Sequence, residues 1–213
     1  MLFAQKAAEI ENLGQPNRLS EHRSYVLGAV LSAATQLEAT INELFVDASD
    51  RYLMHLGTIG KQQVELLGWM WERVLSRRVS FSILEKYDAA LELAGRKPLM
   101  HDRAPYQDVK ALIDLRNELI HFAPQSVPDD CTAARLPQSE RPKLEQRLRG
   151  RFAENSLVAS GNPYKFDKLL GSGCARWSVE STITFVDAFC AQMGIAPPYE
   201  SFRDDLRVEM GAE

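Results

Sequence analysis

The chain has 213 residues, of which 45% are hydrophobic and 25% charged, and its formal net charge is −4. These values are typical of a soluble globular protein with one good core or two small domains, and they exclude a disordered or a membrane-spanning chain. The net charge also excludes a protein that coats nucleic acid through its overall charge.

The signals for location indicate the cytoplasm. The sequence contains no run of about 18 apolar residues, and the N-terminal stretch MLFAQKAAEIENLGQ lacks the basic start and apolar middle of a secretion signal. The three cysteines, Cys131, Cys174 and Cys190, are odd in number and widely spaced. They favour a reducing compartment over a disulfide framework. We therefore expect a cytoplasmic protein.

The first predicted helix follows a short N-terminal arm. Residues 1–19 end in the breaker cluster GQPN, and we expect them to be loosely attached. Ser20 can then cap a long helix that runs to about Ser49. Its apolar residues recur every three or four positions, which is the spacing of one buried stripe: Val26, Val30, Ala34, Leu37, Ile41, Leu44 and Ala48.

Three further helices are predicted from local signals. The third helix of the chain opens with a capping box, because Ser82 and Glu85 have the spacing S-x-x-E. The fourth starts near Pro105, which suits a first helical turn, and ends before Pro124. The second starts near Gly60, and its apolar residues are Val64, Leu67, Trp71 and Val74.

The segment 123–172 is irregular and rich in Pro, Ser, Gly and Asn, which indicates an insertion with a short helix around Leu144 and Leu148. Part of it is basic, with six Lys and Arg residues between positions 135 and 151 against two glutamates. Two interpretations stay open for this basic part. It is either a solvated helix face or a surface that contacts phosphate through Arg147 and Arg151, which are four apart and share a helical face.

The last predicted helix runs from about Ser172 to Met193, and residues 196–213 form a C-terminal extension. No strand-like alternation competes with the helical patterns. The sequence therefore predicts an all-α fold. We expect an antiparallel bundle of four or five helices in residues 20–195, with the irregular insertion between the last two core helices.

Known nucleotide and metal motifs are absent from the sequence. There is no GxxxxGK[ST] loop, no GxGxxG, no HExxH and no CxxC pair, and the four histidines are dispersed. We therefore expect no metal and no cofactor. The stretch GSGCAR at 171–176 predicts a helix-initiating turn, and the alternative is an anion cradle at a helix start.

One stretch combines a helical pattern with polar residues suited to chemistry. LRNELIHF, residues 115–122, carries Arg116, Asn117 and His121 in the fourth predicted helix. An arginine followed after four residues by a histidine resembles the signature of the HEPN superfamily, the higher eukaryotes and prokaryotes nucleotide-binding domains. The helices with LEATINELF and ARWSVESTITFVDAF also resemble bundle helices of bacterial members, so the likeness extends over most of residues 20–193.

A second arginine–histidine pair has a matching spacing. Arg96 and His101 occur in RKPLMH, but Pro98 rules out a helix there. Only Arg116 and His121 lie on a predicted helix with apolar flanks, so the Arg96–His101 pair serves as an internal control.

The resemblance implies a metal-independent endoribonuclease. His121 would transfer protons while the 2′-hydroxyl of RNA attacks the phosphate, Arg116 would hold the phosphate through its planar fork, and Asn117 would orient His121 or bind the phosphate. The resemblance also implies RNA as a partner and a homodimer with the site between two protomers. An antitoxin or a defence-system protein would be a further partner, and the biological role would be that of a toxin or an effector against phage.

Helical geometry separates Arg116 from His121. At about 100° per residue the two diverge by about 140°. They can meet one phosphate only if the arginine stem curls round, if the helix loosens near Phe122, or if a second subunit contributes. Arg116 lies near the centre of an apolar arc formed by Val109, Leu112, Ile113, Leu119 and Ile120, and the opposite arc holds Lys110, Asp114, Asn117, Glu118 and His121.

Two alternatives stay open. Arg116 can pair with Glu38 or Glu43 of the first predicted helix and tie a plain helical scaffold together, since a buried arginine needs an acidic partner. The fold can also be a non-catalytic HEPN-like module that binds nucleotide or RNA, or a dimerising partner subunit. Such a module tolerates the loss of His121, whereas catalysis does not.

Overall fold

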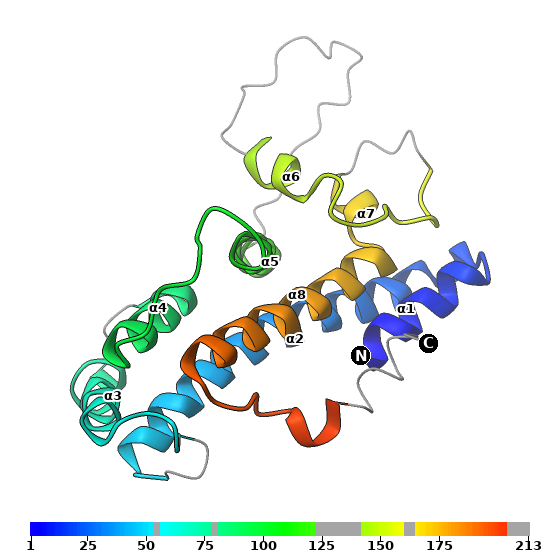
Figure 1. Ribbon diagram of the computed structural model, residues 1–213. Helices are drawn as coiled ribbons and strands as arrows, with labels where there is room; N and C mark the ends of the chain where they lie inside the picture. Colours follow the sequence, from blue (N-terminus) through cyan, green and yellow to red (C-terminus); the bar gives the residue numbers. More distant parts are fainter. Residues whose placement is uncertain (53–55, 78–80, 122–141, 160–164, 204–213) are drawn as a thin grey trace.

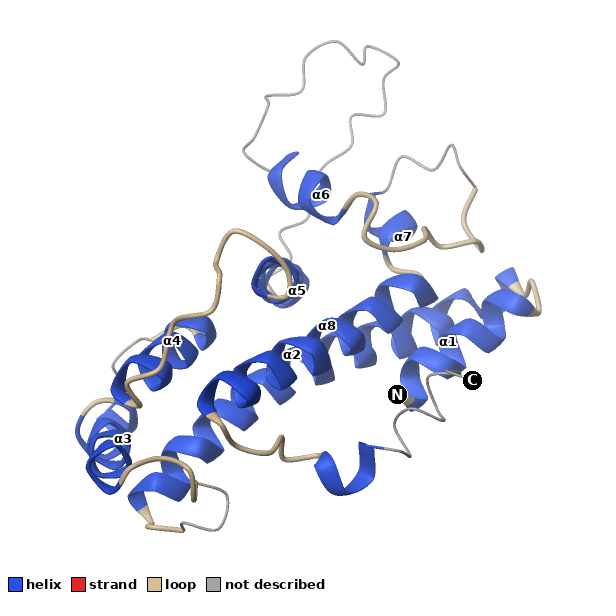
Figure 2. Cartoon of the chain, viewed as in Figure 1, coloured by secondary structure: helices blue, strands red, loops and turns tan. Residues whose placement is uncertain are grey.

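The computed structural model describes residues 1–52, 56–77, 81–121, 142–159 and 165–203 (Figure 1). Within these ranges the chain forms helices and no strand, so the predicted all-α class is confirmed (Figure 2). The helices are α1 (Leu2–Asn12), α2 (Leu19–Ser49), α3 (Lys61–Arg73), α4 (Ile83–Leu93), α5 (Tyr106–Ile120), α6 (Pro142–Leu148), α7 (Lys165–Leu169) and α8 (Ser172–Met193), with short 3-10 helices η1 (Pro16–Arg18), η2 (Leu75–Arg77) and η3 (Glu200–Phe202).

The first element is a packed helix, where the sequence predicted a loose arm. α1 buries Ala4, Ala7 and Ile10 and lies against α2 and α8. The expectation for residues 1–19 is wrong because two alanines and an isoleucine on one side are enough to seat a short helix on two longer ones. The breaker cluster GQPN marks only the turn between α1 and α2.

α2 and α8 are the long central pair, and they lie side by side in the same direction (Figure 1). Glu11 at the end of α1 contacts the first turns of both helices, through His22 of α2 and Ser172 of α8. Further along, the Thr182 hydroxyl donates to the carbonyl of Ala33 at 3.3 Å. The expected antiparallel arrangement is therefore wrong for this pair. A short connection makes two neighbouring helices antiparallel, but α3 to α7 separate these two helices in the chain, so either direction is possible for them.

α3 and α4 pack on α2, and α4 starts with the predicted capping box. The backbone N–H of Ser82 donates to the Glu85 carboxylate at 2.7 Å, and the Glu85 N–H donates to the Ser82 hydroxyl at 3.3 Å. Tyr87 follows in the first turns of α4 and is fully buried. Its hydroxyl donates to the carbonyl of Leu37 at 2.8 Å, and its ring makes edge contacts with two phenylalanines of α8. These contacts join α4 to both central helices.

α5 contacts both α2 and α8 and is seen down its axis in Figure 1, where the central pair lies across the view. α6 packs on α5 with Leu148 buried, so the short helix predicted around Leu144 and Leu148 is confirmed. The insertion expected at 123–172 therefore contributes a helix to the neighbourhood of α5. Its segments 122–141 and 160–164 lie outside the described residues.

Residues 196–203, the described part of the expected C-terminal extension, return to α8. The hydroxyl of Tyr199 lies 2.8 Å from Asp187, and Arg203 binds both carboxylate oxygens of Asp187 at 2.8 Å. This carboxylate raises the pKa of Arg203 above its ordinary value. Among the described helices, none combines the length and the apolar character needed to cross a membrane.

Candidate functional site

The last two turns of α5 hold the polar residues of the LRNELIHF stretch. Arg116 and Asn117 are half-buried, and His121 is exposed at the residue that ends the helix. Nη1 of Arg116 donates to the side-chain oxygen of Asn117 at 3.0 Å. The arginine stem therefore curls from the apolar side of α5 toward its polar face, which is one of the three routes that the helical divergence allows.

No carboxylate among the described residues pairs with Arg116. Glu38 binds Lys86 instead, at 3.3 Å, and Glu43 is exposed. The scaffold alternative, in which one of these glutamates holds Arg116, therefore does not describe this fold. A half-buried guanidinium with one neutral partner keeps its remaining N–H donors and its positive charge available for an anion.

His121 is linked to Asn117 through its backbone. Its backbone N–H donates to the carbonyl of Asn117 at 2.9 Å, which completes the last turn of the helix. Among the described residues its imidazole has no hydrogen-bond partner. Within one chain, Asn117 orients Arg116 and not His121.

The buried side of α5 is wider than the helical projection predicts. Val109 and Leu112 are buried as expected, but Ala111 is buried too, and Ile120 stays 49% exposed. α6 packs against α5 and binds Asp114, a residue that the projection assigned to the polar face. A neighbouring element of the same chain therefore covers a surface that the projection of a single helix leaves to solvent.

Arg147 and Arg151 face α5. Arg147 pairs with Asp114, and Arg151 pairs with Asp108. Arg151 also donates to the carbonyl of Arg147, because a left-handed turn at Gly150 (φ 77°) brings the chain back after α6 ends. Both arginines are therefore paired with carboxylates, and a solvated helix face does not describe them.

The two acidic partners on α5 were not among the residues that the sequence singled out. The feature of the sequence that could have indicated them is complementary charge, since α5 carries acidic residues where it meets basic residues at α6. That signal cannot be read along the chain, because residues 122–141 separate the two helices and the spacing within a helix does not say which faces meet.

The control pair lies in a loop, as predicted. Nε2 of His101 lies 3.0 Å from Asp88, and the imidazole stacks on Tyr106 with 4.1 Å between ring centroids. The Tyr106 hydroxyl donates to the other oxygen of Asp88 at 3.1 Å, and burial raises the pKa of Tyr106 to about 12. Arg96 donates instead to the carbonyl of Thr58 at 3.4 Å. His101 is therefore held in a cluster that Arg96 does not join.

The stretch GSGCAR starts α8, as predicted, and the protein supplies its own anion there. The carboxylate of Glu11 accepts from the backbone N–H of Ser172 at 2.6 Å and from the Ser172 hydroxyl at 2.7 Å. It also lies 2.7 Å from Nε2 of the buried His22. This helix start is therefore occupied by Glu11 and is not open to an external phosphate.

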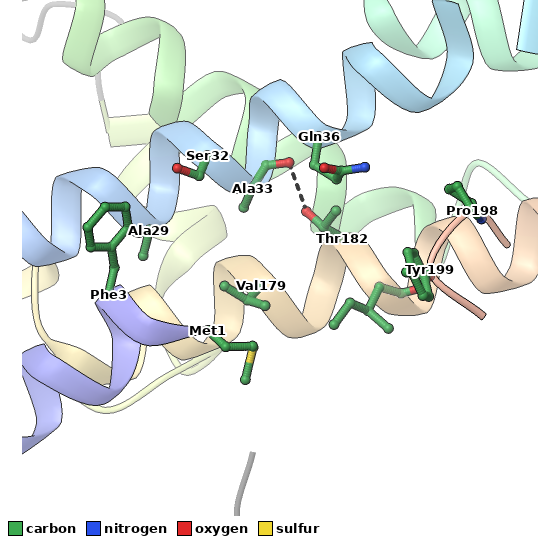
Figure 3. Close-up of a pocket in the computed structure, with 11 residues that line it drawn as sticks. Met1, Phe3, Ala29, Ser32, Ala33, Gln36, Val179, Thr182, Pro198 and Tyr199 are labelled. Atoms are coloured by element: carbon green, nitrogen blue, oxygen red, sulfur yellow. Dashed lines mark hydrogen bonds between the residues drawn. The ribbon is translucent and has the colours of Figure 1, made fainter. Parts of the chain in front are cut away.

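A hollow of about 350 Å³ lies between α2 and α8 (Figure 3). Met1 and Phe3 border one end and Pro198 and Tyr199 the other. The described residues that line it include no charged side chain. The Arg and Lys side chains that bind a phosphate most strongly are therefore not among its described lining residues.

Among the described residues, no group of three or more His, Cys, Asp and Glu side chains could hold a metal ion. Cys174 and Cys190 are free and buried, and burial raises the pKa of each thiol to about 12. Neither cysteine is therefore a thiolate nucleophile near neutral pH.

Comparisons of the chain with models of protein families, with curated proteins and with solved structures found no match. The candidate site consists of a half-buried Arg116 hydrogen-bonded to Asn117 near the end of α5, with an exposed His121 one turn further on.

Proposed function

We propose that the chain is a metal-independent endoribonuclease of the HEPN type. The observation that carries this proposal is Arg116, a half-buried arginine without an acidic partner among the described residues, whose guanidinium binds Asn117. A part-buried guanidinium of this kind keeps N–H donors and a permanent positive charge that an anion can use. The phosphodiester of RNA supplies that anion.

The reaction needs a proton carrier and a phosphate clamp. The 2′-hydroxyl of RNA attacks the adjacent phosphorus while the bond to the 5′-oxygen breaks, which leaves a 2′,3′-cyclic phosphate and a 5′-hydroxyl. Arg116 holds the phosphate through its planar fork of donors. His121 takes the proton from the 2′-hydroxyl or gives one to the leaving 5′-oxygen, because histidine is the side chain suited to proton transfer near neutral pH.

The complete site is composite in this proposal. Among the described residues no hydrogen bond joins His121 to Arg116, whose guanidinium binds Asn117, and the neighbouring Ile120 leaves an apolar side chain exposed. We infer a homodimer whose two-fold axis passes near α5, so that His121 of one protomer approaches Arg116 of the other. The role as a toxin or antiphage effector, with an antitoxin or defence-system partner, is supported by the HEPN resemblance alone.

The test is incubation of the purified protein with total RNA in the presence of EDTA. The wild type is expected to cleave, with products that end in a 2′,3′-cyclic phosphate or the derived 3′-phosphate. His121→Ala should lower the rate by a factor of about 10² to 10⁴. Arg116→Lys keeps the charge but loses the bidentate fork, so it should be strongly impaired.

His101→Ala is the matched control, since His101 lies in the loop pair with the same spacing, and its activity should stay close to that of the wild type. Loss of cleavage in EDTA rejects the proposal. Cleavage by His121→Ala at the wild-type rate rejects it as well.

The second candidate is a non-catalytic HEPN-like module that binds nucleotide or RNA, or a dimerising partner subunit. The contact that favours it is the bond from Arg116 to Asn117, because catalysis needs a positioned histidine and binding does not. RNA binding by both the wild type and His121→Ala, with cleavage by neither, would assign this function.

A further inference from the structure

Two ion pairs hold α6 on α5. Arg147 pairs with Asp114 and Arg151 with Asp108, and all four side chains are part-buried. Leu148 of α6 is buried in the same contact. Basic side chains of the insertion therefore lie on the helix that carries Arg116, and they are held there by carboxylates.

The pairing leaves guanidinium donors unused. Asp114 accepts from Nη1 of Arg147, while Nη2 of Arg147 is buried without a hydrogen-bond partner among the described residues. Arg151 gives Nη1 to Asp108 and its Nε to the carbonyl of Arg147. Neither carboxylate forms the two parallel bonds that a guanidinium fork offers. A buried donor without a partner is unfavourable, so Asp114 leaves part of the hydrogen-bonding capacity of Arg147 unused.

We propose that Arg147 and Arg151 form a binding site for the phosphodiester backbone of single-stranded RNA, and that Asp108 and Asp114 occupy this site until RNA displaces them. The inference rests on the proposed function, since it assigns a substrate contact beside the same helix. Asp114 and His121 are seven residues apart on α5 and point in nearly the same direction. RNA held by Arg147 therefore passes along the side of α5 that carries His121.

The exchange is energetically accessible. Part-exposed ion pairs contribute little to stability, because solvent screens them. A polyanion gains from the release of its counterions when it binds arginines, and this gain grows as salt falls. The two aspartates therefore reduce the affinity for RNA without preventing binding.

The test measures the affinity of the full-length protein for a fluorescein-labelled single-stranded RNA by fluorescence anisotropy, in a His121→Ala background so that the RNA stays intact. Asp108→Asn with Asp114→Asn should bind about threefold to tenfold more tightly, since both pairs are part-exposed. Arg147→Glu with Arg151→Glu should bind more weakly and with a flatter salt dependence. If the double asparagine variant fails to fold, Asp114→Asn alone carries the same comparison with a smaller gain.

The matched control is Asp167→Asn, compared with Asp114→Asn alone, because each change breaks one arginine–aspartate pair and removes one negative charge. Its affinity should stay within about twofold of the parent protein. Equal gains in the control and the test variants would assign the effect to overall charge and overturn the inference, as would an unchanged salt slope in the arginine variants. Tighter binding without any cleavage by the wild type removes the proposed function alone, whereas cleavage with unchanged binding removes this inference alone.

Discussion

Glu11 joins three helices through one carboxylate. It accepts two hydrogen bonds from Ser172 at the start of α8, where the helix dipole favours a negative charge. Its contact with His22 reaches α2, and Nδ1 of that fully buried histidine has no partner among the described residues. The hydrogen bond between His22 and Glu11 is therefore the one that compensates for the burial of the His22 imidazole.

Glu11→Ala should lower the free energy of unfolding by about 3 kcal/mol, because it leaves the buried His22 and the first N–H of α8 without their partner. Urea denaturation followed by circular dichroism measures this loss. Glu9→Ala on the same helix removes an exposed pair with Lys6, which solvent screens, and should lower the free energy of unfolding far less than Glu11→Ala does. Equal losses at the two positions would contradict the role assigned to Glu11.

At the residue scale, the sequence predicts which side chains are unusual for their helix but not which partners they find. Arg116 and Asn117 were singled out as polar residues in an apolar pattern, and they do contact each other. Glu11, Asp108 and Asp114 were not, because each acts on a residue distant in the chain. A carboxylate in an ordinary helical pattern carries no local sign of such a partner.

At the scale of elements, α4 shows how a local signal fixes a boundary. The capping box of Ser82 and Glu85 satisfies backbone donors at the first turn without help from other helices. Ser82→Ala should therefore lower the free energy of unfolding by about 1 kcal/mol. Ser24→Ala is the control in thermal melts, because Ser24 is exposed inside α2 and only bonds back to Ser20. A loss at Ser24 as large as at Ser82 would show that the cap is not the cause.

The capping box also predicts a dependence on pH. Hydrogen bonds from the backbone and the side chain of Ser82 lower the pKa of Glu85 below its ordinary value of 4.5. A lowered carboxyl pKa stabilises the fold above the unfolded value, and this contribution is lost as the pH falls through the folded value. The difference in melting temperature between the wild type and Glu85→Gln should therefore be constant above pH 5 and shrink below about pH 4. If the difference in melting temperature between the two proteins is the same at pH 3 and pH 7, the lowered pKa of Glu85 does not contribute to stability.

Five helices begin and end close to the predicted positions, because their stripes and end signals are local. α2, α3, α4, α5 and α8 all follow from such patterns. α1 does not, because its apolar face is short and the helix is stabilised by its contacts with α2 and α8, which lie far away in the sequence or beyond a turn. The parallel direction of α2 and α8 is also not encoded locally, since a helical stripe has the same period in either direction.

At the scale of the whole molecule, we expect the homodimer to form through the end of α5. Ile120 is 49% exposed beside His121, so the proposed composite site would bring this side chain into the contact between the two protomers. Ile120→Asp should therefore lower the mass measured by light scattering from that of a dimer to that of a monomer. The rate of RNA cleavage should fall in parallel.

Leu13→Asp is the control for this prediction, because Leu13 is 63% exposed at the end of α1. This substitution should leave the molecular mass measured by light scattering unchanged. A wild-type protein that stays monomeric at high concentration would remove the composite site. Cleavage that survives in a monomeric Ile120→Asp variant would place both catalytic groups in one chain.

Because the ribosome synthesises α2 long before α8, the contact between these two helices cannot form until the chain is almost complete. α2 emerges early and α8 late, yet Ala33 and Thr182 lie against each other in the finished protein. Contacts between such distant parts of a chain form slowly, and uncovered apolar surface binds chaperones. A chain stalled before residue 172 lacks the helix that covers α2. We therefore expect truncated translation products to be chaperone clients and protease substrates, whereas the full-length chain escapes both.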